Sequence, residues 1–331
     1  MPAAPGGSAV PASVSGSVPA IPGAPNWDGP EITLWLRMAL EEDLGSGDLT
    51  AHSIVPAGAQ ATARLVARQA LVVAGMPLFE RIFHLLSQDV RIEVLFADGQ
   101  EAPRDAVLAR LAGPARPILS AERTALNFVA HLSGVATLTR RFSEAIAGTK
   151  ASIRDTRKTL PLLRVLEKYA VRAGGGRNHR LGLFDEILIK ENHIAIAGSV
   201  TEAIRRAKAE PVSVPREMTA YESFRAPAES GASRQIPIQV EVRNEAELRE
   251  AIQAGAGSVL VDNTPPVEAA RLIAIARGLS STCVIEISGG VNLSNVRAYA
   301  EAGADYISIG ALTHSAPAAD LSLLVDSSGV E

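Results

Sequence analysis

Positively charged side chains are concentrated in one stretch of the sequence, between Lys150 and Lys190. The stretch contains ten lysines and arginines against four aspartates and glutamates, although acidic residues outnumber basic ones in the whole chain. It includes the run GGGRNHR, from Gly174 to Arg180, in which three glycines precede two arginines and a histidine. A dense group of cations destabilises a folded protein unless an anion neutralises it. The stretch therefore predicts a local anion site, with a solvated helix face as the simpler alternative.

Five cationic or cation-capable side chains in this stretch flank one predicted helix, and we expect them to meet at one end of a sheet. They are Arg157, Lys158, His179, Arg180 and Lys190. Arginine binds carboxylate or phosphate in bidentate fashion, so two arginines and a lysine suit a dicarboxylate or a phosphorylated sugar. Taken alone, a histidine in such a polar loop is as often a satisfied surface residue. The glycines do not match G-x-G-x-x-G and no G-K-S/T follows, so a nucleotide-binding loop is not expected.

Short apolar runs recur in the second half of the chain, and each leads into residues that can do chemistry. The runs are ASIRD, EILIK, IQVEV, SVLVD, VIEIS and YISIG, with amphipathic helical stretches between most of them. This alternation predicts a parallel sheet covered by helices, and the similar segments 254–262 and 302–310 favour a β/α barrel. The carboxyl ends of barrel strands form the active site. At these ends stand Arg157 and Lys158, Lys190, Glu241, Asp262, Ser288 to Gly290, and Ser308 to Gly310.

The first half of the chain predicts a smaller α/β domain. Order is expected from about Trp27, where a first helix begins shortly afterwards. Over residues 61–111, β-like runs and one helix indicate a mostly antiparallel sheet. A long helix is expected to begin after Ser120 as its N-cap. A second is expected to begin at Pro161 and to end just before Gly174.

The sequence thus divides into two expected domains and two additional segments. Residues 27–132 form the expected small α/β domain. Residues 133–312 form the expected barrel. Residues 1–26 are almost entirely Ala, Pro, Gly, Ser and Val, which predicts disorder. Residues 211–237 interrupt the strand and helix alternation and are rich in Pro, Ser, Ala and Glu, which predicts an inserted surface loop.

The overall composition excludes several classes of protein. The chain has 331 residues, of which 47% are hydrophobic and 21% charged, as is typical of a globular protein. Its net charge of −4 provides no general basic field for nucleic acid. The single cysteine, Cys283, excludes an internal disulfide, and its apolar neighbours predict a buried thiol. We expect no membrane span, and because the N-terminal tail lacks basic residues we expect a cytoplasmic location.

A resemblance to a known family is carried by several segments. They are AERTALNFVAHLSGVATLT, TRKTLPLLRVLEKYAVRAGGGRNHRLGLFDEILIKENHI, VEV, VDN, ISGGVN and GADYISIGALTHS. These segments resemble quinolinate phosphoribosyltransferase, also called nicotinate-nucleotide pyrophosphorylase (carboxylating), one of the type II phosphoribosyltransferases. The resemblance runs from about Trp27 to the C-terminus, apart from the insertion. It implies an N-terminal α/β sandwich over residues 27–132, joined by residues 313–331, and an open α/β barrel, assembled as a homodimer.

The resemblance also implies a reaction. Quinolinate would be joined to 5-phosphoribosyl 1-pyrophosphate in the presence of Mg²⁺. Pyrophosphate and CO2 would be released, and nicotinate mononucleotide would be formed for de novo NAD biosynthesis. Neither a nucleic acid nor a membrane would take part.

Individual residues receive roles from the same resemblance. The quinolinate site would consist of Arg157, Lys158, His179 and Arg180, with Thr156 beside them and Arg123 reaching in from the partner subunit. Lys158 and Lys190 would face the pyrophosphate. Glu241 and Asp262 would hold the ribose hydroxyls and, partly through water and pyrophosphate, Mg²⁺. The 5-phosphate would lie on the backbone of Ser288, Gly289, Gly290, Ser308, Ile309 and Gly310, with His314 nearby. The implied catalytic residues are Lys158, Lys190, Glu241 and Asp262.

Two alternatives stay open at the level of sequence. Lys190 at a strand end resembles the Schiff-base lysine of an aldolase, although that chemistry does not explain so many arginines. A paralogue of the same family acting on another acceptor is the second alternative, because of the insertion and the leucine in TRKTLP.

Overall fold

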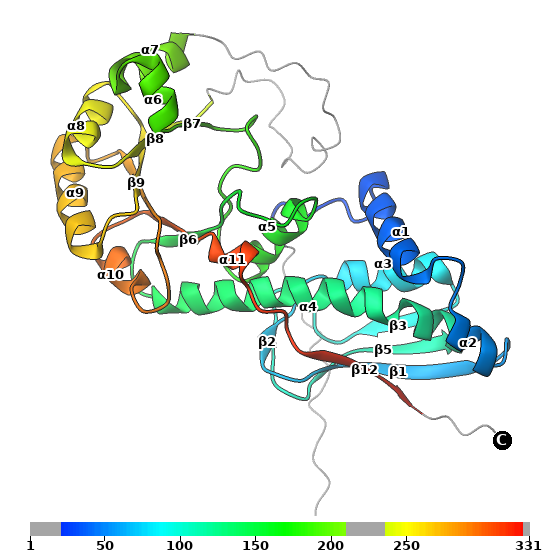
Figure 1. Ribbon diagram of the computed structural model, residues 1–331. Coiled ribbons are helices and arrows are strands. Elements are labelled where there is room, and N and C mark those ends of the chain that lie inside the picture. Colours follow the sequence, from blue (N-terminus) through cyan, green and yellow to red (C-terminus); the bar gives the residue numbers. More distant parts are fainter. Residues whose placement is uncertain (1–20, 210–235, 327–331) are drawn as a thin grey trace, which may run out of the picture.

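The structure is a computed structural model that describes residues 21–209 and 236–326 (Figure 1). Most of the predicted tail over 1–26 and of the predicted loop over 211–237 lies outside the described residues. Within these ranges the chain forms a four-stranded antiparallel sheet, a six-stranded parallel sheet and a two-stranded sheet, and a long helix lies between the two larger sheets. This architecture confirms the predicted α/β fold class.

The antiparallel sheet has the strand order β12-β1-β5-β3. Its strands are β1 (Gln60–Ala67), β3 (Arg91–Val94), β5 (Val107–Pro114) and β12 (Leu321–Asp326). A separate pair is formed by β2 (Leu71–Val72) and β4 (Glu101–Ala102). Side chains of β1 alternate between solvent and interior, because successive residues of a strand point to opposite faces. The buried face packs against a layer of helices, so one face of the sheet is exposed to solvent and the other is buried.

The helices of this first domain are α1 (Pro30–Leu44), α2 (Leu49–Ile54), α3 (Met76–Leu86) and α4 (Ala115–Ala145). Helices α3 and α4 pack on each other, and α4 also contacts β1, β5 and β12. Phe79 and Phe83 of α3 are fully buried, with their ring centroids 4.9 Å apart. Each large apolar side chain removed from water in this way stabilises the fold by about 1.5–3 kcal/mol.

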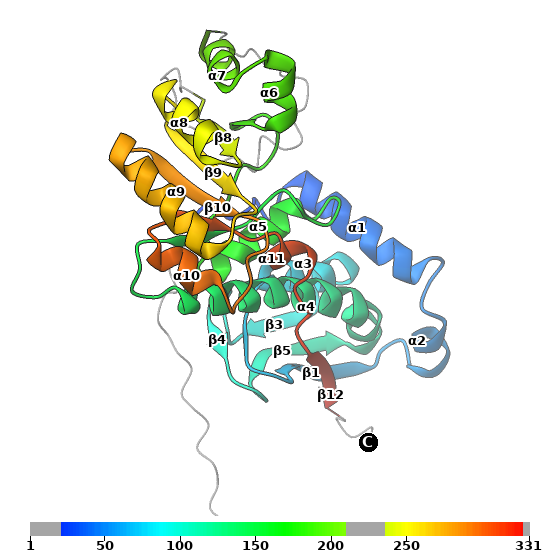
Figure 2. The same ribbon diagram turned by 60° about the vertical axis from the view of Figure 1, so that its left-hand side comes forward.

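Helix α4 begins earlier than the sequence predicts. Its N-cap is Pro114, not Ser120, whose hydroxyl instead donates a hydrogen bond of 2.8 Å to Asp48. The predicted start was wrong, because the helix extends through Pro117 to Ala115. A proline in the first turn of a helix is tolerated, since its missing N–H would have no intrahelical partner there. The helix spans 31 residues, or about 46 Å at 1.5 Å per residue. Figure 2 shows it running between the two sheets.

The parallel sheet has the strand order β6-β11-β10-β9-β8-β7. Its strands are β6 (Ser152–Arg154), β7 (Ile187–Ile189), β8 (Ile238–Val242), β9 (Ser258–Asp262), β10 (Val284–Ser288) and β11 (Tyr306–Ser308). All six apolar runs of the sequence therefore form strands. β6 and β7 occupy opposite edges, so the sheet, with helices along its outer side, has the arrangement of an open barrel (Figure 1).

The helices of the second domain are α5 (Arg164–Ala173), α6 (Glu191–Ala197), α7 (Val200–Ala209), α8 (Glu245–Gln253), α9 (Pro266–Leu279), α10 (Val296–Glu301) and α11 (Ala311–His314). Helix α5 begins at Arg164, three residues after the predicted start at Pro161. The intervening Leu162 has a φ of +66°, a left-handed conformation that no helix contains. At the other end Gly174 has a φ of −75°, and Gly175, at +91°, is the residue that ends the helix in the left-handed region.

Candidate active site

A cavity of about 450 Å³ lies at the carboxyl ends of the parallel strands. Every predicted site residue except Arg123 lines it. These residues are Thr156, Arg157, Lys158, His179, Arg180, Lys190, Glu241, Asp262, Ser288, Gly289, Gly290, Ser308, Ile309, Gly310 and His314. The lining also includes Leu188, Leu260, Glu286, Val291 and Ala311. The cavity therefore combines a basic group, a pair of carboxylates and two glycine-containing turns.

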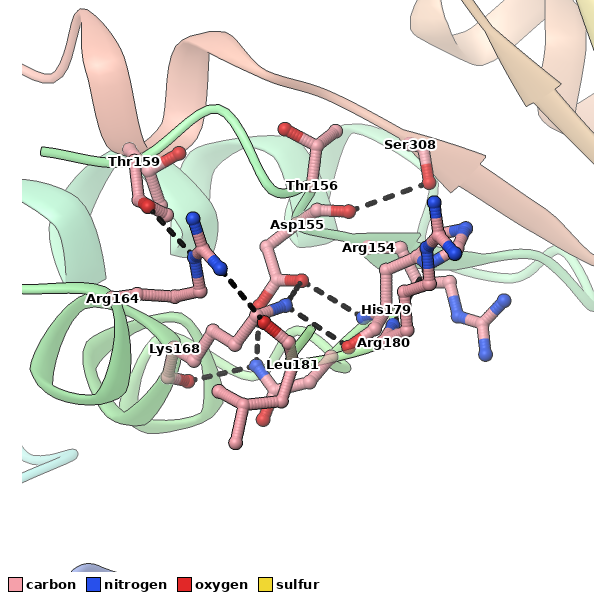
Figure 3. Close-up of polar contacts among 12 residues, drawn as sticks. Arg154, Asp155, Thr156, Thr159, Arg164, Lys168, His179, Arg180, Leu181 and Ser308 are labelled. Atoms are coloured by element: carbon pink, nitrogen blue, oxygen red, sulfur yellow. Dashed lines mark hydrogen bonds and ion pairs between the residues drawn. The ribbon is translucent and has the colours of Figure 1, made fainter. Parts of the chain in front are cut away.

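The basic group is positioned by Asp155, which is fully buried directly after β6. Its carboxylate accepts hydrogen bonds from the Lys168 ammonium at 2.5 Å and from the His179 backbone N–H at 2.8 Å, and it also accepts one from the Asn178 amide. Figure 3 shows these contacts joining the loop after β6 to the loop after α5. Burial lowers the pKa of Lys168, and the charge of Asp155 opposes that shift. Two loops distant in sequence are thus held at one place.

The loop after Lys158 is also tied to the long helix α4. Glu167 on α5 is fully buried. One of its carboxylate oxygens accepts the Leu160 backbone N–H at 3.2 Å, and the other lies 2.8 Å from His131 Nε2 of α4. The hydroxyl of Thr313 on α11 donates to the Lys158 carbonyl at 2.7 Å. These contacts fix the backbone on which the cavity-lining cations are carried.

Two arginines of the cavity crowd each other. The Nε atom of Arg157 is buried, and no described residue forms a hydrogen bond with it. Arg180 Nη1 donates to the Glu186 carbonyl at 3.1 Å. Burial lowers the pKa of Arg180, and the charge of Arg157 lowers it further. An anion bound between the two guanidinium groups would offset both the burial and the mutual repulsion, because it supplies negative charge and hydrogen-bond acceptors together.

The two carboxylates stand on the neighbouring strands β8 and β9. Glu241 is mostly buried and forms an ion pair with the Lys190 ammonium, while Asp262 ends β9. Burial raises the pKa of Glu241, the charge of Lys190 opposes that rise, and the charge of Asp262 adds to it. Within residues 21–209 and 236–326, no group of three or more His, Cys, Asp or Glu side chains could hold a metal ion. A cation bound here would therefore need ligands beyond these two carboxylates.

Two glycines after β10 leave room that a side chain would fill. Gly289 and Gly290 have φ angles of +87° and +64°, which residues with a side chain rarely adopt. A Cβ atom on Gly289 would lie 2.8 Å from the Asn263 backbone nitrogen. At the second turn, a Cβ atom on Gly310 would lie 3.0 Å from the Lys158 side chain and 3.1 Å from that of His314. Glycine at these turns lets backbone groups approach a ligand closely.

Arg123 is the one predicted site residue outside this cavity. It lies on α4 with its side chain exposed. The structure describes a single chain, and within that chain Arg123 does not line the cavity.

Several buried polar residues in the cavity wall or behind it were missed by reasoning from the sequence. Glu286 and Gln239 are fully buried in the middle of β10 and β8, and Arg154 donates to Glu286 at 2.7 Å. Their only signal is a polar residue inside an otherwise apolar run, in VIEIS and IQVEV. Such a residue needs a partner, but the partner lies on another strand. Cys283 is buried, as predicted.

Across the described residues, no helix has both the length and the apolar character needed to cross a membrane.

Comparison with known proteins assigns both domains. The description "Quinolinate phosphoribosyl transferase, N-terminal domain" matches residues 48–133. The corresponding C-terminal domain matches residues 135–233 and 216–324. The probable nicotinate-nucleotide pyrophosphorylase (carboxylating) of Bacillus subtilis is 40% identical over 283 residues, which are 85% of this chain and 89% of that protein. The Mycobacterium leprae nicotinate-nucleotide pyrophosphorylase (carboxylating) is 39% identical over 87% of this chain and 95% of its own length.

Solved structures give the same result. The nicotinate-nucleotide pyrophosphorylase of Francisella tularensis superposes with a TM-score of 0.78 at 37% identity, covering 89% of this chain and 96% of that one. The enzyme of the same name from Ehrlichia chaffeensis has a TM-score of 0.78 at 36% identity, covering 89% of this chain and 98% of the other. The C-terminal domain match, over residues 135–233 and 216–324, includes the residues that line the cavity. This chain belongs to the quinolinate phosphoribosyltransferase family.

Proposed function

We propose that this protein is a quinolinate phosphoribosyltransferase. It joins the pyridine nitrogen of quinolinate to the anomeric carbon of 5-phosphoribosyl 1-pyrophosphate, and it releases pyrophosphate and CO2 to give nicotinate mononucleotide. The proposal is carried chiefly by one observation: a basic group and a pair of carboxylates line the same cavity, at the strand ends of a chain from this family. The basic group suits a diacid. The pair of carboxylates suits the ribose hydroxyls and the metal ion of 5-phosphoribosyl 1-pyrophosphate.

The basic group binds the acceptor in this proposal. Arg157 and Arg180 bind the two quinolinate carboxylates, with Lys158 and Thr156 beside them. Each charge-assisted hydrogen bond of this kind contributes about 1.5–3 kcal/mol. Binding two carboxylates at once fixes the plane of the ring, so the ring nitrogen faces the sugar. Positioning of this kind reduces the barrier without any proton transfer by the protein.

The other residues bind the donor. Lys158 and Lys190 stabilise the negative charge that develops on pyrophosphate as its bond to the anomeric carbon breaks. Glu241 and Asp262 hold the ribose hydroxyls. The backbone around Ser288–Gly290 and Ser308–Gly310, with His314 nearby, receives the 5-phosphate.

Electrons balance over the two steps. The nitrogen lone pair forms the new bond while the carbon–oxygen bond to pyrophosphate breaks. The ring nitrogen is then cationic, and it stabilises the electron pair left on the adjacent carbon when CO2 departs. A proton from solvent completes the product.

The two carboxylates fit Mg²⁺ as a partial set of ligands. Mg²⁺ is commonly held by one or two carboxylates, with water and phosphate oxygens as its other ligands. Glu241 and Asp262 on neighbouring strands provide that number. When bound, the metal would supply positive charge to the pyrophosphate leaving group. The cytoplasmic location and the homodimer, with Arg123 completing the partner's site, also belong to the proposal.

An aldolase that uses Lys190 has less support. A Schiff-base lysine must attack a carbonyl with a free lone pair. The Lys190 ammonium is instead ion-paired with Glu241. No observation favours this chemistry over phosphoribosyl transfer.

The experiment that tests the function follows the carboxylate that is lost. The protein is incubated with 5-phosphoribosyl 1-pyrophosphate, Mg²⁺ and quinolinate labelled in its 2-carboxylate, and labelled CO2 and nicotinate mononucleotide are measured. We expect both products in equal amounts, and none from nicotinate. Product from nicotinate without CO2 would identify a paralogue for another acceptor, and no product from either acid would contradict the proposal.

A further inference from the structure

One buried carboxylate in the wall of the cavity has no part in the function proposed above. The Glu286 side chain is fully buried in β10. One of its oxygens accepts hydrogen bonds from Arg154 Nη1 at 2.7 Å and from Gln239 Nε2 at 3.0 Å, and the other accepts one from the Ser308 hydroxyl. Three donors satisfy this carboxylate inside the protein, so its charge is neutralised before any substrate arrives. It is therefore suited to orienting its neighbours.

The first neighbour that Glu286 orients is the Gln239 amide. The nitrogen of this amide donates to Glu286 at 3.0 Å and to the Ser258 hydroxyl at 3.1 Å, which uses both of its N–H groups. The amide oxygen is thereby turned toward His179, whose Nε2 lies 3.2 Å away. An amide oxygen can only accept a hydrogen bond, so it requires a proton on Nε2.

The second ring nitrogen of His179 has an equally clear partner. The Arg180 backbone N–H donates to His179 Nδ1 at 2.7 Å. A backbone N–H can only donate, so Nδ1 must carry no proton. The two partners thus assign the same tautomer, a neutral imidazole with its proton on Nε2.

Two carboxylates face the ring at greater distances. Glu286 lies 3.4 Å from Nε2, and Glu186 lies 3.6 Å from Nδ1. Burial raises the pKa of Glu186, which weakens its pull on a second proton. The shorter contact at Nδ1 comes from the Arg180 N–H, and it would be lost if that nitrogen were protonated.

We propose that Glu286 and Gln239 are positioning residues, which hold His179 as a neutral imidazole protonated on Nε2 at the edge of the acceptor site. Under the function proposed above, the charge that one chain supplies to quinolinate then comes from Arg157, Arg180 and Lys158. Arg154 is excluded from that charge by its ion pair with Glu286. The arrangement suits the chemistry, because the acceptor ring becomes cationic and a neutral imidazole does not repel it.

The tautomer is measured on the wild-type chain without substrate. The protein is labelled with ¹⁵N-histidine, and two-bond proton–nitrogen correlations are recorded at pH 7. The His179 signals are identified by their loss in His179→Asn. We expect the pattern of a neutral ring protonated on Nε2. A ring protonated on both nitrogens, or on Nδ1 alone, would overturn the proposal. This result does not depend on whether quinolinate is turned over.

Two variants then test the positioning role. Gln239→Glu replaces the amide with a second carboxylate beside Nε2, and we expect a doubly protonated ring. Glu286→Gln frees the Gln239 amide to rotate, and we expect a mixture of tautomers. In each variant a proton on Nδ1 removes the acceptor of the Arg180 N–H, which loosens Arg180 at the acceptor site. The KM for quinolinate should therefore rise about tenfold or more, as for the loss of one charge-assisted hydrogen bond from Arg180, while the KM for the phosphoribosyl donor changes less than about twofold.

The matched control is Glu301→Gln on α10, a carboxylate that pairs with Arg297 on the surface. It should leave the spectrum and both KM values unchanged. If Glu286→Gln raises both KM values equally and leaves the ring tautomer unchanged, the residue is merely structural and the proposal is wrong. If the spectra are as expected but no quinolinate reacts, the proposed function fails and the tautomer assignment stands.

Discussion

Lys190 and Glu241 form the charged pair at the cavity where leaving-group charge would be stabilised. The Lys190 side chain is 43% exposed and Glu241 is 9% exposed, so the pair is accessible to a ligand from the lysine side. The donor molecule can therefore reach this ion pair and form contacts with Lys190 or Glu241 that replace their contact with each other. For this reason we expect the pair to matter far more for turnover than for stability.

Lys190→Ala and Glu241→Ala should each lower kcat by about 100-fold or more, the loss typical of removing a group that stabilises transition-state charge. Unfolding free energies from urea titration should change by no more than about 1 kcal/mol, because the pair is partly exposed. Glu245→Ala, which removes an exposed ion pair with Arg249, is the control and should keep full activity. Normal turnover in either cavity variant would contradict the site.

The residues that line the cavity can be predicted from the sequence because the carboxyl ends of parallel strands must lie together. Lys190, Asp262 and Ser288 each end or directly follow an apolar run. Glu286 and Gln239 cannot be assigned in the same way. They lie within strands that are buried on both faces, and their partners depend on which strands are neighbours in the sheet.

At the scale of elements, the connection between β6 and α5 carries backbone strain. Leu162 has a φ of +66° and a side chain that is 62% exposed, so the strain is not offset by burial of this leucine. A left-handed conformation costs a residue with a side chain about 1–2 kcal/mol. The position therefore suits a glycine better than a leucine.

Leu162→Gly should raise the unfolding free energy by about 0.5–1 kcal/mol, since relief of the left-handed strain exceeds the entropy cost of glycine. The measurement is urea denaturation. Leu183→Gly is the matched control, because Leu183 is an exposed loop leucine without a positive φ. It should lose about 0.5–1 kcal/mol. Equal losses in both variants would mean that the Leu162 side chain makes a stabilising contact.

Asp305 joins three elements of the barrel just before β11. Its carboxylate accepts hydrogen bonds from the Ile285 N–H at 2.8 Å, from Lys150 at 2.7 Å and from Arg277 at 2.5 Å. Burial alone would raise the pKa of Asp305, but these three donors lower it overall. A lowered pKa in the folded state adds stability that is present above the unfolded pKa and lost as the pH falls through the folded one.

Asp305→Asn should therefore lower the unfolding free energy by about 1–2 kcal/mol at pH 7, where the wild-type carboxylate is charged. The difference should stay constant down to about pH 5 and shrink below about pH 4, where the unfolded wild type takes up a proton. Denaturant titrations at several pH values measure it. The exposed Asp89→Asn should change stability by less than about 0.5 kcal/mol. A difference that grows toward low pH would contradict the lowered pKa.

The existence and type of these elements can be predicted from the sequence, whereas some of their ends cannot. Apolar runs separated by amphipathic stretches specify strands and helices directly, and all six runs form strands. Helix starts depend on capping geometry that more than one residue can satisfy. The Ser120 hydroxyl donates a hydrogen bond to Asp48 instead of capping α4. After Pro161, Leu162 adopts a left-handed conformation, and α5 begins only beyond it.

At the scale of the whole molecule, the chain connects the two domains twice, through α4 and through its return to the first domain at β12. The last strand, β12, returns to the first domain and pairs with β1, and α4 contacts elements of both sheets. Arg123 lies on this helix, exposed and outside the cavity of its own chain. A partner subunit is therefore required if Arg123 is to take part in binding.

Mixing Arg123→Ala chains with Lys190→Ala chains tests that sharing. In a two-fold symmetric dimer, half of a random mixture is heterodimer and each heterodimer holds one intact site, so about a quarter of wild-type activity should return. Each variant alone should be nearly inactive. Mass spectrometry of the mixture verifies that heterodimers have formed. Verified heterodimers without recovered activity would place the whole site within one subunit.

Binding of a diacid by the two arginines of the cavity is most directly measured by calorimetric titration of the free protein with quinolinate and with nicotinate. Wild type should bind quinolinate at least about tenfold more tightly, because the second carboxylate adds charge-assisted hydrogen bonds. In Arg157→Ala and in Arg180→Ala this preference should disappear. Equal affinity of the wild type for the two acids, or an unchanged preference in both variants, would contradict the assignment of these arginines to the acceptor.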